Sequence, residues 1–244
     1  AVLRTMVELR DISQLGDMII ESFAATAAMV GGPADGEVAF EMETVFGFFP
    51  PHALASQVGL PPTAGERARL AAPCEYRVDL RARPPRYFAG PAHLPGPMLL
   101  MLDRVTGYWP EAGQAGLGRL RAEKDVEPGE WFFRAHFFQD PVMPGSLGIE
   151  AMGQLLQWYL IERGGAADLA GQGFEPVMTG HRLTWRYRGQ VLPTDGRLTI
   201  ELEITGLGED ERGRYATADG WLWVDGLRIY HVSDLGMRAV PGRR

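Results

Sequence analysis

The chain has 244 residues, a formal net charge of −7, and 45% hydrophobic and 10% aromatic residues, which is enough for a globular core. The negative charge argues against a nucleic-acid-binding surface, and the single Cys74 excludes an intrachain disulfide and fits a reducing cytoplasm. We find no signal peptide and no apolar run long enough to span a membrane, so we expect a cytoplasmic protein.

The N-terminal residues alternate in the manner of β-strands. Residues 3–30 predict two strands joined by a turn at Gly16-Asp17, and a second turn over 31–36 leads to a strand that ends near Phe49. The chain starts inside the first of these strands and without a methionine, so we expect it to be a piece of a longer protein.

Residues 61–97 are rich in proline, arginine and alanine. This composition predicts a linker that follows an extended path over the surface, with one short strand at 76–80. Beyond the linker we expect strands at 98–108 and 115–124, followed by a turn at 125–130.

The stretch over 131–150 has the composition of a catalytic turn. His136 lies among aromatic residues, Pro141 and Pro144 stiffen the loop that follows, and Gly145 lets the backbone approach a ligand closely. An imidazole held in such a loop is a candidate acid or base.

A helix is predicted over 147–163, with Ser146 as its N-cap and Gly164-Gly165 as its end. Apolar residues occur on nearly every side of it, which indicates a buried helix. Glu150 lies inside this helix, and a buried carboxylate needs either a partner or a proton.

His136 and Glu150 form a plausible acid/base pair. The pattern is equally compatible with a hydrogen-bonded core histidine and a glutamate on a solvated helix edge, because purely structural networks also contain such pairs. Among the other histidines, His181 is the candidate for approaching the site, although simple hydrogen bonding is the commoner role. No spacing of histidines, cysteines or carboxylates fits a metal site, and no glycine pattern fits a nucleotide.

The C-terminal part again predicts antiparallel strands, at 198–204, 215–224 and 227–235, with a hairpin turn at Asp225-Gly226 between the last two. The order of strands and turns is the same as in residues 3–49. We interpret this as a weak internal repeat.

From Pro95 to its end the chain resembles the FabA-type β-hydroxyacyl-acyl-carrier-protein dehydratases, which have the hotdog fold. The matching runs, in the family's order, are Met98-Leu-Leu-Met-Leu-Asp-Arg-Val105, Glu130-Trp-Phe-Phe, Ala135-His-Phe, Asp140-Pro-Val-Met-Pro-Gly145, Leu147-Gly148, Ala151-Met152, Gly189-Gln-Val-Leu-Pro193, Val224-Asp-Gly226 and Val232-Ser-Asp-Leu235.

This resemblance implies an α+β fold in which a long antiparallel sheet wraps around a central helix. The residues that it places in the site are His136 and Glu150 as the catalytic pair, Gly145 and Ser146 as the amides that bind the thioester carbonyl, and Pro144 and Gln154 as supporting residues. Glu150 stands where the family has an aspartate, and related FabZ-type dehydratases carry glutamate there.

The chain is also similar to the dehydratase domains of polyunsaturated fatty acid synthases and iterative polyketide synthases. The runs that carry this likeness are Val45-Phe-Gly-Phe-Phe-Pro50, Gln57-Val-Gly-Leu-Pro61, and Phe138-Gln139 together with Ser146. Two positions depart from the FabA pattern, since Ser146 replaces a cysteine and Gly153 replaces a bulky aromatic residue. The shape of the acyl tunnel, and with it isomerisation of the enoyl product, therefore stays open.

Together with the internal repeat, the resemblance predicts a double hotdog. We expect a partial or degenerate first hotdog at 1–62, the linker at 63–94 and a catalytic hotdog at 95–244. Hotdog dehydratases take the histidine from one hotdog and the acid from the other. Both residues lie in the second hotdog here, so we expect a complete site to need two chains or a partner half.

The implied reaction removes water from a (3R)-3-hydroxyacyl thioester and gives the trans-2-enoyl thioester. The substrate is carried on the phosphopantetheine of acyl carrier protein, and we expect no other cofactor and no metal. The expected partners are acyl carrier protein, other domains of a larger synthase and a second copy in a homodimer, but neither nucleic acid nor membrane. Two alternatives keep the fold: a non-catalytic scaffold that binds acyl chains, and a hotdog thioesterase.

Overall fold

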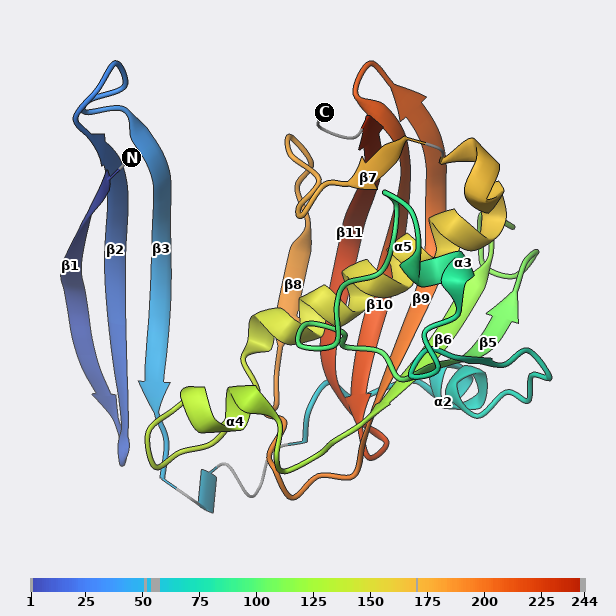
Figure 1. The fold of residues 1–244 in the computed structure, drawn as a ribbon. Coiled ribbons are helices and arrows are strands. Elements are labelled where there is room, and N and C mark those ends of the chain that lie inside the picture. The colour runs from blue at the N-terminus through green and yellow to red at the C-terminus, as the bar shows by residue number, and fades with distance from the viewer. Residues whose placement is uncertain (1, 51, 54–57, 170, 242–244) are drawn as a thin grey trace. The chain divides into compact units, whose positions relative to one another are not determined.

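The computed structural model describes residues 2–50, 52, 53, 58–169 and 171–241. The chain divides into two compact units, residues 1–57 and residues 58–244. Each unit contains its own antiparallel sheet (Figure 1).

The first unit is a three-stranded sheet in the order β1 (Val2–Leu15), β2 (Met18–Val30) and β3 (Val38–Phe48). Gly16 has φ 65° in the turn between β1 and β2, a conformation that favours glycine. The strands and turns predicted for this part of the chain are confirmed.

The two faces of this sheet differ in polarity. Residues paired across strands share a face, as Val7, Ala25 and Met42 do. The face that contains this row, called the apolar face below, carries the exposed side chains of Leu3, Val7, Leu9, Ile12, Ile19, Phe40, Met42, Phe46 and Phe48. The opposite face carries the charged residues Arg4, Glu8, Asp11, Glu41 and Glu43 together with the exposed apolar residues Val2, Met6 and Val45. An exposed apolar surface of this extent is unusual for a soluble domain and marks a surface that packs against something.

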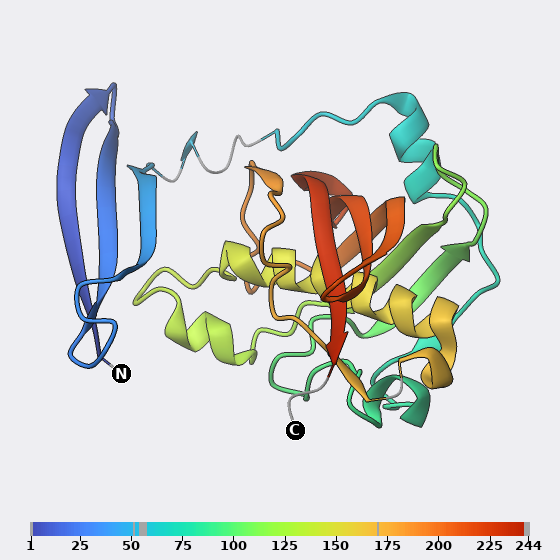
Figure 2. The ribbon, with the colours of Figure 1, turned by 90° about the horizontal axis from the view of Figure 1, so that it is seen from above.

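The second unit is an eight-stranded antiparallel sheet in the order β4-β5-β6-β9-β10-β11-β7, with β8 also paired to β11. Its strands are β4 (Val78–Asp79), β5 (Arg104–Trp109), β6 (Arg119–Asp125), β7 (Gln172–Phe174), β8 (Thr184–Tyr187), β9 (Arg197–Asp210), β10 (Gly213–Val224) and β11 (Leu227–Pro241). The helices are α2 (Ala64–Leu70), α3 (Pro85–Phe88), α4 (Trp131–Ala135) and α5 (Gly145–Asp168). Figures 1 and 2 show that the sheet curls around α5.

The core of this unit lies between α5 and the concave face of the sheet. The large apolar side chains of α5 that are fully buried are Met152, Leu155, Leu156, Trp158 and Tyr159. Small residues on β10 make room for the helix, since a Cβ on Gly220 would lie 3.0 Å from Sδ of Met152. The prediction of a buried central helix is therefore confirmed.

The segment expected to be a linker, residues 63–94, belongs to the second unit. It contains α2 and α3, and it contributes the buried side chains of Leu80, Tyr87 and Leu94 to the core. Because these apolar residues are buried, the segment packs as part of the second unit. It is not the extended surface linker that its proline content predicted.

Two other boundaries differ from the prediction. The strand expected over 98–108 begins only at Arg104, because the main chain at Leu99 and Met101 is hydrogen-bonded by the side chain of Gln154 and not by a neighbouring strand. The strand expected over 115–124 begins only at Arg119, after glycines with positive φ that bend the chain.

Helix α5 is longer than predicted at both ends. It begins at Gly145, so Ser146 lies within the first turn and is not the N-cap. It runs to Asp168 through Gly164 and Gly165, which were expected to end it. Glycine is only a weak helix breaker, and packing overrides its preference here, since Leu169 just beyond the helix is buried in the core.

Among the described residues, no helix is long and apolar enough to cross a membrane, and no group of histidines, cysteines and carboxylates could hold a metal ion.

The contact between α5 and β11 gives a prediction. A Cβ on Gly148 would lie 2.2 Å from the buried ring of Tyr230, whereas a Cβ on Gly153 would meet only Cε of Met237 at 3.5 Å. We expect Gly148→Ala to lower the free energy of unfolding by about 1–3 kcal/mol, because a rigid core must shift. Gly153→Ala is the matched control and should be neutral or stabilising by up to about 1 kcal/mol, because alanine favours the helix. Denaturant unfolding measures both, and equal effects would contradict the packing described.

Candidate functional site

His136 ends α4 and begins the loop that leads to α5. Its main-chain N–H donates to the carbonyl of Phe132 at 2.9 Å, and its carbonyl accepts from the N–H of Val142 at 2.8 Å. Nδ1 of its ring lies 2.9 Å from the carbonyl oxygen of Val142. Since a carbonyl only accepts, Nδ1 carries the proton and Nε2 has a free lone pair. The imidazole is thus held in the tautomer of a base.

The loop after His136 is a tight turn with an apolar tip. The main chains of Phe137 and Asp140 hydrogen-bond to each other, and Gln139 between them has φ 61°. The ring of Phe137 lies over that of His136, with 3.7 Å between the centroids. Phe138 is 89% exposed at the tip. The turn therefore shields one face of the imidazole and presents a large apolar side chain outward.

The start of α5 is held against the sheet by close contacts. The N–H of Met143 donates to the carbonyl of Val191 at 3.0 Å. A Cβ on Gly145 would lie 2.9 Å from the indole of Trp185 and 3.5 Å from the hydroxyl of Tyr230. Only glycine allows this approach. Burial raises the pKa of Tyr230 well above its usual value, so its hydroxyl keeps its proton.

The first N–H groups of α5 point away from the helix interior, as at every helix N-terminus. Neither Gly145 nor Ser146 donates its main-chain N–H to an acceptor among the described residues. Two adjacent free donors at the positive end of a long helix suit an oxyanion or a polarised carbonyl.

Glu150 is half-buried one turn into α5. Its Oε1 accepts a hydrogen bond from Nε2 of Gln154 at 2.7 Å. Gln154 is fully buried, and it also donates to the carbonyl of Leu99 and accepts from the N–H of Met101, both at 2.8 Å. A single carboxamide thus orients the carboxylate and fixes the main chain at Leu99 and Met101 beside it.

The structure brings the predicted residues into one segment but does not join the acid to the base. Gly145, Ser146, Glu150 and Gln154 all lie in the first half of α5, and Pro144 immediately precedes them. No hydrogen bond or ion pair links His136 to Glu150. Each of them is held instead by its own neighbours, Val142 and Gln154 respectively.

The other histidines have structural partners. Nε2 of His181 lies 2.7 Å from the carbonyl of Asp234, and Nδ1 of His93 lies 2.7 Å from the carbonyl of Leu94. The ring of His231 stacks on Trp221 at 5.6 Å. His52 lies 3.4 Å from the carboxylate of Asp17 in the first unit.

Sequence reasoning missed the aromatic wall behind the start of α5. Trp185, Tyr187 and Tyr230 contact one another, with ring centroids 4.9–5.6 Å apart. The available signal was the alternation of Trp185 and Tyr187 on a short strand together with two glycines, Gly145 and Gly148, on the helix that faces them.

Residues 94–233 match the model of the FabA-like domain family. The chain belongs to the FabA-like family. The match contains every predicted site residue, and the curled antiparallel sheet around α5 is the hotdog fold that the resemblance implied.

One of the polyunsaturated fatty acid synthase subunits of Thraustochytrium is 30% identical over 269 aligned residues, which cover 98% of this chain. The chain spans only 16% of the length of that relative. Among solved structures, the dehydratase heterocomplex ApeI:P from Xenorhabdus doucetiae is similar, with 19% identity and a TM-score of 0.43 over 63% of this chain and 89% of that one. AziG from S. sahachiroi has 10% identity and a TM-score of 0.34 over 50% of this chain and 84% of its own.

The role of Gln154 gives a second prediction. Gln154→Leu leaves the N–H of Met101 and the carbonyl of Leu99 unpaired, and each should cost about 1–3 kcal/mol of the free energy of unfolding. Gln157→Leu, one turn further along α5, is the matched control, because Oε1 of Gln157 is buried and has no partner among the described residues. The control should be neutral or stabilising. Denaturant unfolding measures both variants. Equal losses of stability would contradict the role of Gln154 in holding the main chain at Leu99 and Met101.

Proposed function

We propose that this FabA-like chain removes water from (3R)-3-hydroxyacyl thioesters and forms trans-2-enoyl thioesters. The observation that carries the proposal is the fixed tautomer of His136, which begins the loop that leads to the two free amides at the start of α5. The substrate is proposed to be carried on the phosphopantetheine of acyl carrier protein, with no further cofactor.

His136 acts as the base. Its Nε2 takes the proton from the carbon next to the thioester carbonyl, and the hydrogen bond from Nδ1 to Val142 stabilises the resulting imidazolium. Negative charge develops on the carbonyl oxygen in this step. The amides of Gly145 and Ser146, at the positive end of α5, stabilise that charge.

Glu150 acts as the acid. In its protonated form it gives its proton to the hydroxyl at the third carbon, the C–O bond breaks, and the electron pair from the C–H bond forms the double bond. Water leaves, and the proton on His136 returns to Glu150 through solvent. Gln154 is a positioning residue, because it holds the carboxyl group without touching the substrate.

We further propose that two copies of the chain build the complete site, with His136 from one and Glu150 from the other. This fits the separate support of the two side chains within one chain. By analogy with its long relative, we propose that the chain works as one dehydratase domain among others in a larger synthase.

The test is to incubate the chain with a short 3-hydroxyacyl pantetheine thioester and follow the products by mass spectrometry. We expect a product lighter by one water, and a rate that falls by about 10²–10⁴-fold in His136→Ala. His181→Ala is the control and should retain the rate, because its imidazole bonds only the carbonyl of Asp234 among the described residues. Free acid as the product would indicate a thioesterase, and unchanged substrate would indicate a scaffold.

We also propose that the first unit is the sheet of another hotdog, whose apolar face lies on a helix comparable to α5. The small residues Ala25 and Ala27 lie in the middle of that face, on the central strand β2. In the second unit Ala218 and Gly220 stand on β10, where α5 crosses. Large apolar residues around a row of small ones leave space for a helix.

The polarity of this sheet gives a prediction with a built-in control. Phe46 lies on the apolar face, and Val45 is exposed to a similar degree on the opposite face. Because this face is exposed in the chain alone, we expect Phe46→Glu to weaken the binding of a fluorescent hydrophobic dye to it, while Val45→Glu leaves dye binding unchanged. Equal dye binding by the two variants would contradict the proposed packing.

A further inference from the structure

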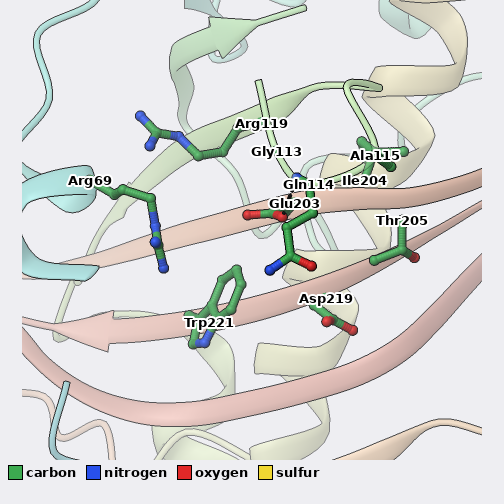
Figure 3. Close-up of a pocket in the computed structure, with 10 residues that line it drawn as sticks. All are labelled: Arg69, Gly113, Gln114, Ala115, Arg119, Glu203, Ile204, Thr205, Asp219 and Trp221. Atoms are coloured by element: carbon green, nitrogen blue, oxygen red, sulfur yellow. Dashed lines mark hydrogen bonds between the residues drawn. The ribbon is translucent and has the colours of Figure 1, made fainter. Parts of the chain in front are cut away.

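A cavity of about 720 Å³ lies on the sheet of the second unit, away from α5 (Figure 3). Its lining residues Arg119, Glu203, Asp219 and Trp221 alternate along β6, β9 and β10 with residues buried against α5, so they point to the other face of the sheet. Arg69 of α2 completes the wall. Helix α2 thus crosses the outer face of the sheet and turns a flat surface into a concave one.

Specific contacts hold this wall in place. Arg228 donates to the carbonyls of Leu60 and Pro61 and bonds the carboxylate of Glu66 at 2.6 Å. On the other side of the cavity Gly113, at φ 90°, brings the chain close to Glu203, whose Oε1 accepts from the N–H of Gln114 at 2.8 Å. Both rims are therefore fixed by the protein itself.

Two arginines on β6 differ in a way that points to a ligand. Arg119 and Arg121 lie on the same face of the strand and are 9% and 8% exposed. Arg121 is fully engaged, since it bonds Thr106 and the carbonyls of Leu70 and Ala72. Arg119 makes no hydrogen bond and no ion pair with a described residue, and its Nε is buried without a partner.

The guanidinium of Arg119 is nevertheless charged and oriented. It stacks on the indole of Trp109, with 4.0 Å from Cζ to the ring centroid, which leaves its edge donors free. Burial lowers the pKa of Arg119, and the charge of Glu201 partly offsets this effect. An arginine in a protein keeps its proton even so. A buried cation without a hydrogen-bonding partner is costly unless something pairs with it.

The two arginines of the cavity lie on the same side of it. Arg69 and Arg119 lie there with Trp221, Asp219 and Thr205 lie on the other side, and Glu203, the cross-strand partner of Arg119, lies between them (Figure 3). Arg69 also makes no ion pair with a described residue. The carboxylates are already partly satisfied, because Glu203 accepts from Gln114 and Asp219 from the N–H of Asp234.

From this arrangement we infer that the cavity binds an oxyanion, a phosphate or carboxylate group of a small molecule, between Arg69 and Arg119. Two neighbouring guanidinium groups offer the paired N–H donors to which phosphate and carboxylate oxygens bind. This site is separate from the one that contains His136 and Glu150 and does not depend on the proposed dehydration.

The experiment is an NMR titration of the full chain, read at the indole N–H of Trp221 and the Nε–H of Arg119. Inorganic phosphate and acetate are the probes, and sodium chloride at equal ionic strength is the control. We expect chemical shifts that saturate with phosphate or acetate. The probe that binds with the higher affinity shows whether the site prefers a phosphate or a carboxylate group. Arg69→Gln should weaken binding at least about tenfold, whereas Arg67→Gln, an exposed residue of the same helix outside the cavity, should not.

Stability measurements separate this proposal from a purely structural role. Without a partner for Arg119, Arg119→Met should not lower the melting temperature, whereas Arg121→Met should lower it clearly, because it removes the bonds to Thr106, Leu70 and Ala72. Equal shifts with chloride, no saturable shift with either oxyanion, or unchanged binding in Arg69→Gln would overturn the site. An equal loss of melting temperature in the two methionine variants would do the same.

Discussion

The packing of α5 inside the curled sheet is the constraint on which the second unit depends. A long helix can lie this close to a sheet only where glycines leave room for the large side chains of the facing element, as Gly145, Gly148 and Gly220 do. The close approach places Tyr230 against the first turns of the helix. It thereby fixes the free amides at the helix start relative to the loop that carries His136.

Within that frame the two candidate catalytic groups are prepared independently. Val142 sets the tautomer of His136 through its carbonyl, and Gln154 sets the orientation of Glu150 through its amide. Neither arrangement requires substrate, so little reorganisation is needed when charge develops. The free base on the loop and the oriented carboxyl group on the helix are what an elimination reaction needs.

The sequence was informative where local chemistry dominates. The alternation in β1–β3, the Asp225-Gly226 hairpin and the buried helix followed from periodicity and turn residues. Prediction from the sequence failed where a side chain distant in the sequence decides the local structure. Gln154 withdraws the main chain at 99–101 from the sheet, and burial of Leu80 and Leu94 turns a proline-rich segment into part of the core. The unpaired Arg119 could not be foreseen, because its sequence neighbourhood is the same as that of the fully paired Arg121.

The most direct test of the central claim is complementation between two inactive variants, His136→Ala and Glu150→Gln. Each is purified alone, the two are mixed, and native mass spectrometry confirms that mixed assemblies form. If base and acid come from different chains, the mixture dehydrates a 3-hydroxyacyl pantetheine thioester although neither parent does, because one site in a mixed dimer is intact. Mixed dimers that stay as inactive as the parents would contradict a site shared between chains.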